Sequence, residues 1–112
     1  MKFTYIYDIL IKISEKGLAM ASTKVYLDFV LGQIKDVDIT HKKMMGEYLL
    51  YANGVLFGGI YDDRLLIKPT EKTKALLPNA EYASPYEGAK PMIFCDFVDD
   101  SEALSAFVKK LI

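Results

Sequence analysis

The chain has few of the side chains on which most catalytic and metal sites depend. Its 112 residues include one histidine, one cysteine and no tryptophan. A single cysteine excludes an internal disulfide framework, and one histidine with one cysteine disfavours a transition-metal site. The adjacent Gly58 and Gly59 lie inside an apolar run, without the surrounding pattern of a phosphate-binding loop. We therefore expect no cofactor and no enzymatic activity.

The lone histidine and the lone cysteine have simple structural explanations. His41 stands beside two lysines, which indicates an exposed loop or the start of a strand. Cys95 lies inside an apolar stretch, where a thiol usually behaves as an inert small hydrophobic group. Neither neighbourhood contains a group that would activate a nucleophile.

The chain also lacks an excess of charge and a long hydrophobic run. Fourteen basic and fifteen acidic side chains give a net charge of −1, so a general electrostatic grip on nucleic acid is not supported. Asp8 and Lys12 interrupt the apolar N-terminal stretch, which excludes a secretory signal and a membrane span there. We expect a cytoplasmic protein that does not contact a membrane.

Residues 1–19 differ from the rest of the chain and leave two alternatives open. Either they add a strand or a helix to the domain, or translation starts at Met20 and the segment is not native. Lys16-Gly17 can be encoded by the purine-rich AAAGGA, a short distance before the Met20 codon, as in a bacterial ribosome-binding site. In both cases the sequence predicts one domain over residues 20–112.

The most informative part of the sequence is the stretch 44–69. Two apolar runs meet at Asn53-Gly54, and a third follows Asp62-Asp63. Asn-Gly between alternating apolar residues is the strongest short-range signal for a hairpin. The stretch therefore predicts a three-stranded antiparallel meander.

Helical signals lie on both sides of the meander. Apolar residues at helical spacing predict a helix over 23–35, capped by Ser22 or Thr23, and a last helix opened by Asp99. Between them, Thr70 starts a short helix to Leu77, residues 79–91 form a loop, and residues 92–97 form a strand. The fold class is α+β, with a small antiparallel sheet and amphipathic helices from both ends of the domain packed on it.

Two-residue turns would fix the pairing of the strands. Counting outward from Asn53-Gly54 pairs Leu50 with Phe57, Tyr48 with Gly59, and Gly46 with Tyr61. Two tyrosine rings would then cover two strand glycines, which compensates for the packing that glycine lacks.

The same register predicts two sheet faces. The core face under the helices would carry Met45, Leu49, Tyr51, Leu56, Ile60, Leu65 and Ile67. Glu47 would lie among them opposite Ile60, where it reaches solvent at the sheet margin, pairs with Lys43, or serves a function. The other face would carry Tyr48, Phe57, Tyr61, Arg64 and Lys68. Those side chains either bind a partner or are covered by the N-terminal segment or the last helix.

Three stretches of the chain resemble one known family: MASTKVYLDFVLGQI (20–34), KKMMGEYLLYANGVLFGGIYDDRLLIKPT (42–70) and LLPNAEYASPYEGAKPM (76–92). They resemble the N-terminal domain of the TfoX/Sxy family. The resemblance implies a cytoplasmic α+β domain. In the competence regulators of this family the domain precedes a helical C-terminal domain and works with the cyclic-AMP receptor protein. We expect a single-domain member without that C-terminal domain, in which the family's basic-Met-Phe-Gly pattern reads Lys43-Met44-Met45-Gly46. The family supplies no catalytic residues.

These observations favour a regulatory protein-interaction module over two alternatives. Its candidate surface comprises Lys43, Glu47, Tyr48, Phe57, Tyr61, Arg64, Lys68, Tyr86, Glu87 and Lys90. One alternative is a small-ligand or enzymatic domain that uses Glu47, Glu87 or Lys90. The other is a weak nucleic-acid-binding module. A homodimer through a strand edge or through the Tyr48 and Phe57 face is an open alternative.

Overall fold

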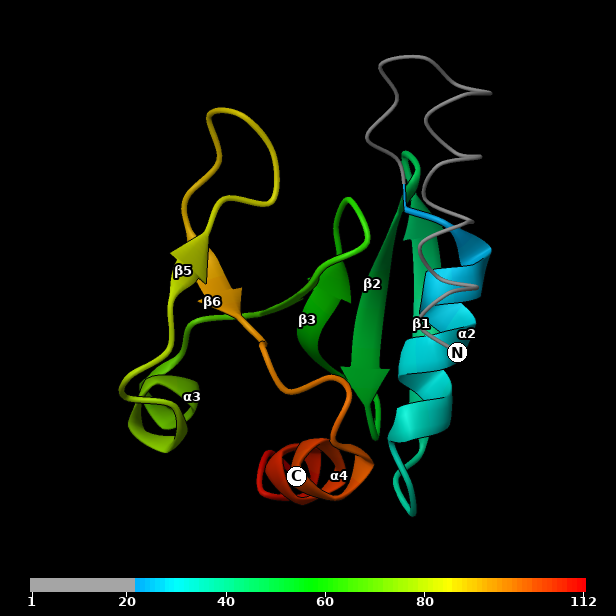
Figure 1. Cartoon of the computed structure of the whole chain (residues 1–112), viewed down its shortest axis with the longest axis vertical. Helices are drawn as coiled ribbons and strands as arrows, with labels where there is room; N and C mark the ends of the chain where they lie inside the picture. The colour runs from blue at the N-terminus through cyan, green and yellow to red at the C-terminus, as the bar shows by residue number, and fades with distance from the viewer. Residues whose placement is uncertain (1–21) are drawn as a thin grey trace.

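The computed structural model describes residues 22–112, which form a six-stranded antiparallel sheet and three helices (Figure 1). The strand order is β1-β2-β3-β4-β6-β5. In chain order the elements are α2 (Lys24–Gln33), β1 (Ile39–Met44), β2 (Glu47–Ala52), β3 (Val55–Ile60), β4 (Leu65–Ile67), α3 (Glu71–Leu76), β5 (Tyr82–Ala83), β6 (Met92–Phe94) and α4 (Ser101–Lys109). The predicted α+β class and the meander of β2, β3 and β4 are confirmed. The alternatives for residues 1–19 lie outside the described residues.

Helix α2 begins at the predicted cap. The hydroxyl of Thr23 accepts a hydrogen bond from the backbone N–H of Tyr26 at 3.1 Å, which satisfies a donor that the first turn leaves open. The helix ends at Gln33, two residues before the predicted end. Its last carbonyl accepts hydrogen bonds from the hydroxyls of Ser101 (2.6 Å) and Ser105 (3.1 Å), so the end of α2 is held by α4.

The other two helices also start at capping residues. Thr70 and Thr73 exchange side-chain and backbone hydrogen bonds in a capping box at the start of α3, as the short helix from Thr70 predicted. Helix α4 is capped by Asp100, whose carboxylate accepts from the N–H of Ala103 at 3.0 Å. The prediction of Asp99 as the cap is therefore wrong by one residue.

Two strands fall outside the predicted meander and the predicted strand at 92–97: β5, which was not predicted, and β1, which contains His41 and so agrees with the start of a strand among the two alternatives for that residue. β1 contains Thr-His-Lys-Lys, and residues 40–44 are all exposed, so it has no apolar alternation that would reveal a strand. β5 occupies two residues of the predicted loop 79–91 and pairs with β6. β6 is shorter than predicted and ends at Phe94. Backbone hydrogen bonds to the neighbouring strands define β1 and β5. The pattern of side chains along the sequence does not reveal such bonds.

The register between β2 and β3 differs from the prediction because β3 contains a bulge. Tyr51 pairs with Leu56, but the residue before it, Leu50, pairs with Gly58. Phe57 therefore has no partner on β2. Beyond the bulge Leu49 faces Gly59 and Tyr48 faces Ile60. Three predicted pairs are therefore wrong: Leu50 with Phe57, Tyr48 with Gly59, and Gly46 with Tyr61. The Asp62-Asp63 turn is a two-residue hairpin as predicted, with mutual backbone hydrogen bonds between Tyr61 and Arg64 of 2.9 and 3.0 Å.

The predicted faces of β2 are reversed. Its buried residues are Tyr48, Leu50 and Ala52, which join a core that includes Leu27 of α2 and Leu104 of α4. Three residues of the predicted core face do belong to this core, namely Ile60, Leu65 and Ile67. The other four do not: Leu49, Tyr51 and Leu56 are half-buried on the opposite face, and Met45 is exposed in the turn before β2. We call the side that carries α2 and α4 the helix face and the opposite side the open face.

Candidate functional site

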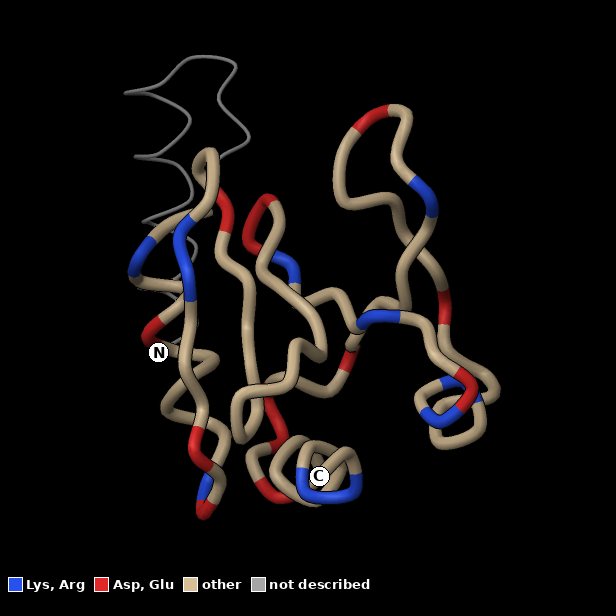
Figure 2. The backbone as a smooth tube through the Cα atoms, turned by 180° about the vertical axis from the view of Figure 1, so that it is seen from behind, with Lys and Arg blue, Asp and Glu red and all other residues tan. Residues whose placement is uncertain are grey.

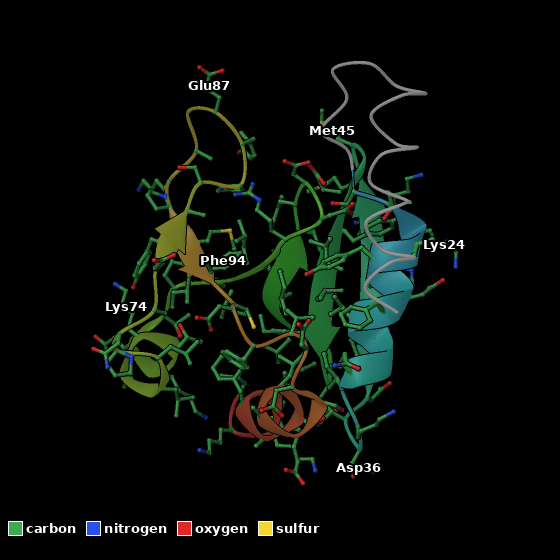
Figure 3. All side chains as sticks on the ribbon, viewed as in Figure 1. Lys24, Asp36, Met45, Lys74, Glu87 and Phe94 are labelled. Carbon is green, nitrogen blue, oxygen red and sulfur yellow. The ribbon has the colours of Figure 1, made fainter. Side chains whose placement is uncertain are left out.

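Three turns meet at one end of the molecule, at the top of Figure 1. They are the β1–β2 turn at Met45-Gly46, the β3–β4 turn at Asp62-Asp63 and the β5–β6 loop around Tyr86. Figure 3 labels Met45 and Glu87 near the tips of the first and the last. Loops that a rigid sheet positions in this way commonly carry binding residues.

Below these turns two cavities adjoin on the open face. The first has a volume of about 500 Å³ and is lined by Met44, Met45, Glu47, Leu49, Tyr61 and Tyr86. The second, of about 400 Å³, is lined by residues that include Leu49, Leu56, Tyr61, Lys68, Lys90 and Met92. Because Leu49 and Tyr61 line both, we call the two adjoining cavities together the Tyr61 groove. Its floor is apolar, and charged side chains stand along its margins.

The ring of Tyr61, which lines both cavities, packs over Gly59. A Cβ atom at Gly59 would lie 2.8 Å from Cε2 of the Tyr61 ring and 2.7 Å from the carbonyl oxygen of Tyr48. The pairing of a tyrosine ring with a strand glycine thus exists, but within β3 and its turn rather than across strands. Burial, then Glu47, then Tyr86 raise the pKa of Tyr61 above its ordinary 10.0, so its hydroxyl is a neutral donor at physiological pH.

Glu47 is half-buried and helps to fasten the turn end of the sheet. One of its carboxylate oxygens accepts from the hydroxyl of Ser22 at 2.8 Å and from the N–H of Asp62 at 3.3 Å. The same hydroxyl lies 3.1 Å from the carbonyl oxygen of Ile60. Asp63 adds a second link, because its carboxylate accepts from the N–H of Thr23 at 2.8 Å. These bonds hold the start of α2 against the β3–β4 turn.

Arg64 connects the β3–β4 turn to the β5–β6 loop. Its guanidinium donates to the carbonyl oxygens of Ser84 at 3.1 Å, Pro85 at 3.4 Å and Tyr61 at 3.1 Å. The loop therefore stands beside the groove instead of extending into solvent. Arg64 thus fixes the backbone of Ser84 and Pro85. Tyr86 follows Pro85 directly, and its side chain lines the first cavity.

Of the ten residues of the predicted interaction surface, five line the Tyr61 groove and the other five lie elsewhere. Glu47, Tyr61, Tyr86, Lys68 and Lys90 line the groove, and Arg64 positions its loop. Glu87 stands at the loop tip, pointing away from the sheet (Figure 3). Lys43 pairs with Tyr48 and so projects to the helix face. Tyr48 and Phe57 were expected on the second face, but they are 7% and 4% exposed and lie in the core, because the bulge turns Phe57 inward.

Met45, like Leu49 and Leu56, is a groove residue that the sequence prediction placed wrongly on the core face. Its side chain is 96% exposed, and its backbone has a φ of 52°. The Asn53-Gly54 turn has nearly the same conformation, with φ values of 50° and 84° against 52° and 83° at Met45-Gly46. The signal that would have revealed this turn is a glycine between two strand-forming runs, but Met in place of Asn hides it.

The remaining reactive groups of residues 22–112 form no second site. Cys95 is 2% exposed, and burial raises the pKa of its thiol to about 12, so it stays protonated and unreactive. Across this range no group of three or more His, Cys, Asp or Glu side chains is arranged to hold a metal ion. Nor does any helix in it combine the length and the apolar character needed to cross a bilayer.

Comparison with known proteins agrees with the architecture. The family model of the TfoX N-terminal domain matches residues 32–110, from the end of α2 to the end of α4. A relative from Spirochaeta aurantia, described as an uncharacterized 12.7 kDa protein in the trpE 5′ region, is 35% identical over 80 residues, which is 70% of each chain. The resemblance expected from the three quoted stretches is thereby confirmed. The chain belongs to the TfoX N-terminal domain family.

Proposed function

We propose that this chain is a non-enzymatic protein-interaction module whose partner binds in the Tyr61 groove. The observation that carries the proposal is Met45, an almost fully exposed apolar side chain in a backbone conformation that asparagine or glycine would adopt more readily. A residue that departs from the local rules without a packing gain is a candidate for function.

The surroundings of Met45 support a protein as the partner. Met44 is 48% exposed and Tyr86 65% exposed, and with Met45 they surround the mouth of the first cavity. Methionine and tyrosine are enriched at protein interfaces because they provide large contact areas with adaptable or amphipathic side chains. Leu49 and Leu56 on the groove floor add apolar surface that the helices do not cover. An apolar anchor of a partner would fill such a site.

Membership of the TfoX N-terminal domain family is the reason that we propose a regulatory role. The TfoX N-terminal domain is known from competence regulators, and a link to transcription in this chain is part of our proposal. An interaction module fits that role because a regulator can act through a partner without chemistry of its own. The proposed partner is therefore a protein of the regulatory machinery of the cell.

Co-purification from the native host tests the proposal. Tagged wild-type chain and a Met45→Asn variant would be cross-linked in cells, purified and compared by mass spectrometry. Val55→Thr is the matched control, because Val55 is also an exposed apolar side chain, 62% exposed, at the opposite end of the β2–β3 hairpin. We expect one discrete protein with the wild type and the control and its loss with Met45→Asn. Equal recovery with all three would refute the groove as the binding site.

A further inference from the structure

The strand β1 is an open edge of the sheet. In the part of the chain that the structure describes, β1 pairs with β2 alone, and residues 40–44 are all exposed. Proteins usually shorten or bend such edges, or place proline in them, to prevent pairing with other chains. β1 has six residues in unbroken register with β2 and contains no proline. Within residues 39–44, the two lysines are the feature that would discourage pairing with another chain.

The register shows which backbone groups point outward. Asn53 donates its N–H to the carbonyl oxygen of Asp38 at 2.9 Å, and hydrogen-bonded pairs recur at every second residue of an antiparallel ladder. Thr40 and Lys42 therefore bond toward β2. The N–H and C=O groups of the residues between them, Ile39, His41 and Lys43, point away from the sheet. These three residues present a row of donors and acceptors for another strand.

The charge on β1 indicates the chemistry of such a strand. Lys42 and Lys43 are consecutive, and the ion pairs recorded within residues 22–112, Lys24 with Asp28 and Lys109 with Asp36, include neither of them. Figure 2 shows this basic stretch in blue along β1. Pairing with β1 of a second copy would bring four lysines together, and like charges on facing strands are destabilising. An acidic strand would instead be attracted.

We propose that β1 binds an extended, acidic segment of a partner protein by strand addition. The segment would exchange backbone hydrogen bonds with Ile39, His41 and Lys43, the mode in which main-chain bonds supply affinity and side chains supply specificity. Lys42 projects to the open face beside Leu49, and Lys43 projects to the helix face beside Tyr48. Acidic residues at successive positions of the segment would therefore each meet one lysine. The edge of β1 adjoins the Tyr61 groove at Met44, but strand addition uses the backbone of β1 and goes beyond the function proposed for the groove.

A model peptide tests strand addition directly. The probe is a blocked octapeptide with two adjacent glutamates between threonines, Thr-Thr-Thr-Glu-Glu-Thr-Thr-Thr, titrated into the full-length, ¹⁵N-labelled chain while amide chemical shifts are recorded. We expect the largest shifts at the amides of Ile39, His41 and Lys43. The same peptide methylated on its four central backbone nitrogens keeps its charge but cannot pair, so its affinity should fall at least about tenfold. Equal affinity, or the largest shifts outside β1, would overturn the proposal.

Two protein variants complete the test. Lys42→Glu with Lys43→Glu should lose the glutamate peptide and gain a threonine–lysine peptide of the same length. His41→Pro removes an outward N–H without removing a bond to β2, so it should weaken peptide binding while the thermal unfolding temperature stays near that of the wild type. Unchanged binding in either folded variant would count against the proposal. Both experiments leave Met45 intact, so their failure would not bear on the groove.

Discussion

At the scale of single residues, Met45 departs most from what its local structure favours. Side chains other than glycine, asparagine and aspartate are strained in the left-handed region, and Met45 gains no burial in return, since it is 96% exposed. The same chain uses asparagine in its other turn of this type. This contrast within one molecule is the reason that we propose a functional role for the methionine.

Replacing this residue should stabilise the protein. Met45→Asn puts a residue that tolerates positive φ into the turn, so the free energy of unfolding should rise by about 0.5–1 kcal/mol. Urea denaturation of the variant and the wild type measures the difference. Val55→Thr should give no such gain, because it leaves both turns unchanged. A variant less stable than the wild type would mean that Met45 has a structural role after all.

Cys95 gives a prediction about alkaline pH. Its thiol ionises with a pKa near 9.0 in the unfolded chain but about 12 in the folded protein, so ionisation favours unfolding as pH rises from about 9 to about 12. The stability contributed by the protonated thiol is therefore complete below pH 9 and is lost through this window. Relative to Cys95→Ala, the wild type should lose up to about 1.4 kcal/mol per pH unit above pH 9.

Urea denaturation of both proteins between pH 8 and about 10.5 measures this loss. Tyrosine and lysine ionisation affects both proteins alike, so the difference between them reports Cys95. A difference that stays constant with pH would show that the thiol is not protected by burial.

At the scale of elements, Arg64 joins two segments that are distant in the chain. Its bonds to the carbonyl oxygens of Ser84 and Pro85 fix the β5–β6 loop beside the groove. Arg64→Met keeps the aliphatic part of the side chain but removes these bonds. Hydrogen exchange at the amide of Ala89, which bonds within the loop to Tyr86 at 3.1 Å, should accelerate about tenfold. Lys68→Met is the charge-matched control and should leave this rate unchanged. Equal rates in all three proteins would show that the bonds from Arg64 do not hold the β5–β6 loop in place.

The elements with local chemical signals were the predictable ones. Thr23 and Thr70 cap helices, and Asn53-Gly54 closes a hairpin, because short-range hydrogen bonds and φ preferences determine these structures. The bulge at Phe57 has no such signal. In β2 the run Tyr-Leu-Leu-Tyr is apolar on both faces, so its pattern fits either orientation, and one unpaired residue reversed the assignment. The groove residues could be named from the sequence in part, but their meeting at one site could not.

At the scale of the whole molecule, the sheet has one covered face and one open face. Helices α2 and α4 cover the face of Leu50, whereas Leu49 lines the groove on the other. Leu50→Ala should lower the free energy of unfolding by about 2–5 kcal/mol, as expected for a fully buried leucine. Leu49→Ala should lower it by less than about 1.5 kcal/mol, because its side chain is half-buried. Chemical denaturation of both variants measures these losses. A larger loss for Leu49→Ala than for Leu50→Ala would instead support the sheet faces predicted from the sequence, with Leu49 in the core.

We propose the groove on the open face as the binding site, and a photo-cross-linker placed at position 45 tests this proposal most directly. Benzoylphenylalanine would replace Met45 in one protein and Val55 in another, and both would be irradiated in cells of the native host. We predict that position 45 cross-links to one discrete partner protein and that position 55, which is also exposed but lies at the far end of the hairpin, does not. The same adducts from both positions, or none from position 45 while the partner still co-purifies, would contradict the Tyr61 groove as the binding site.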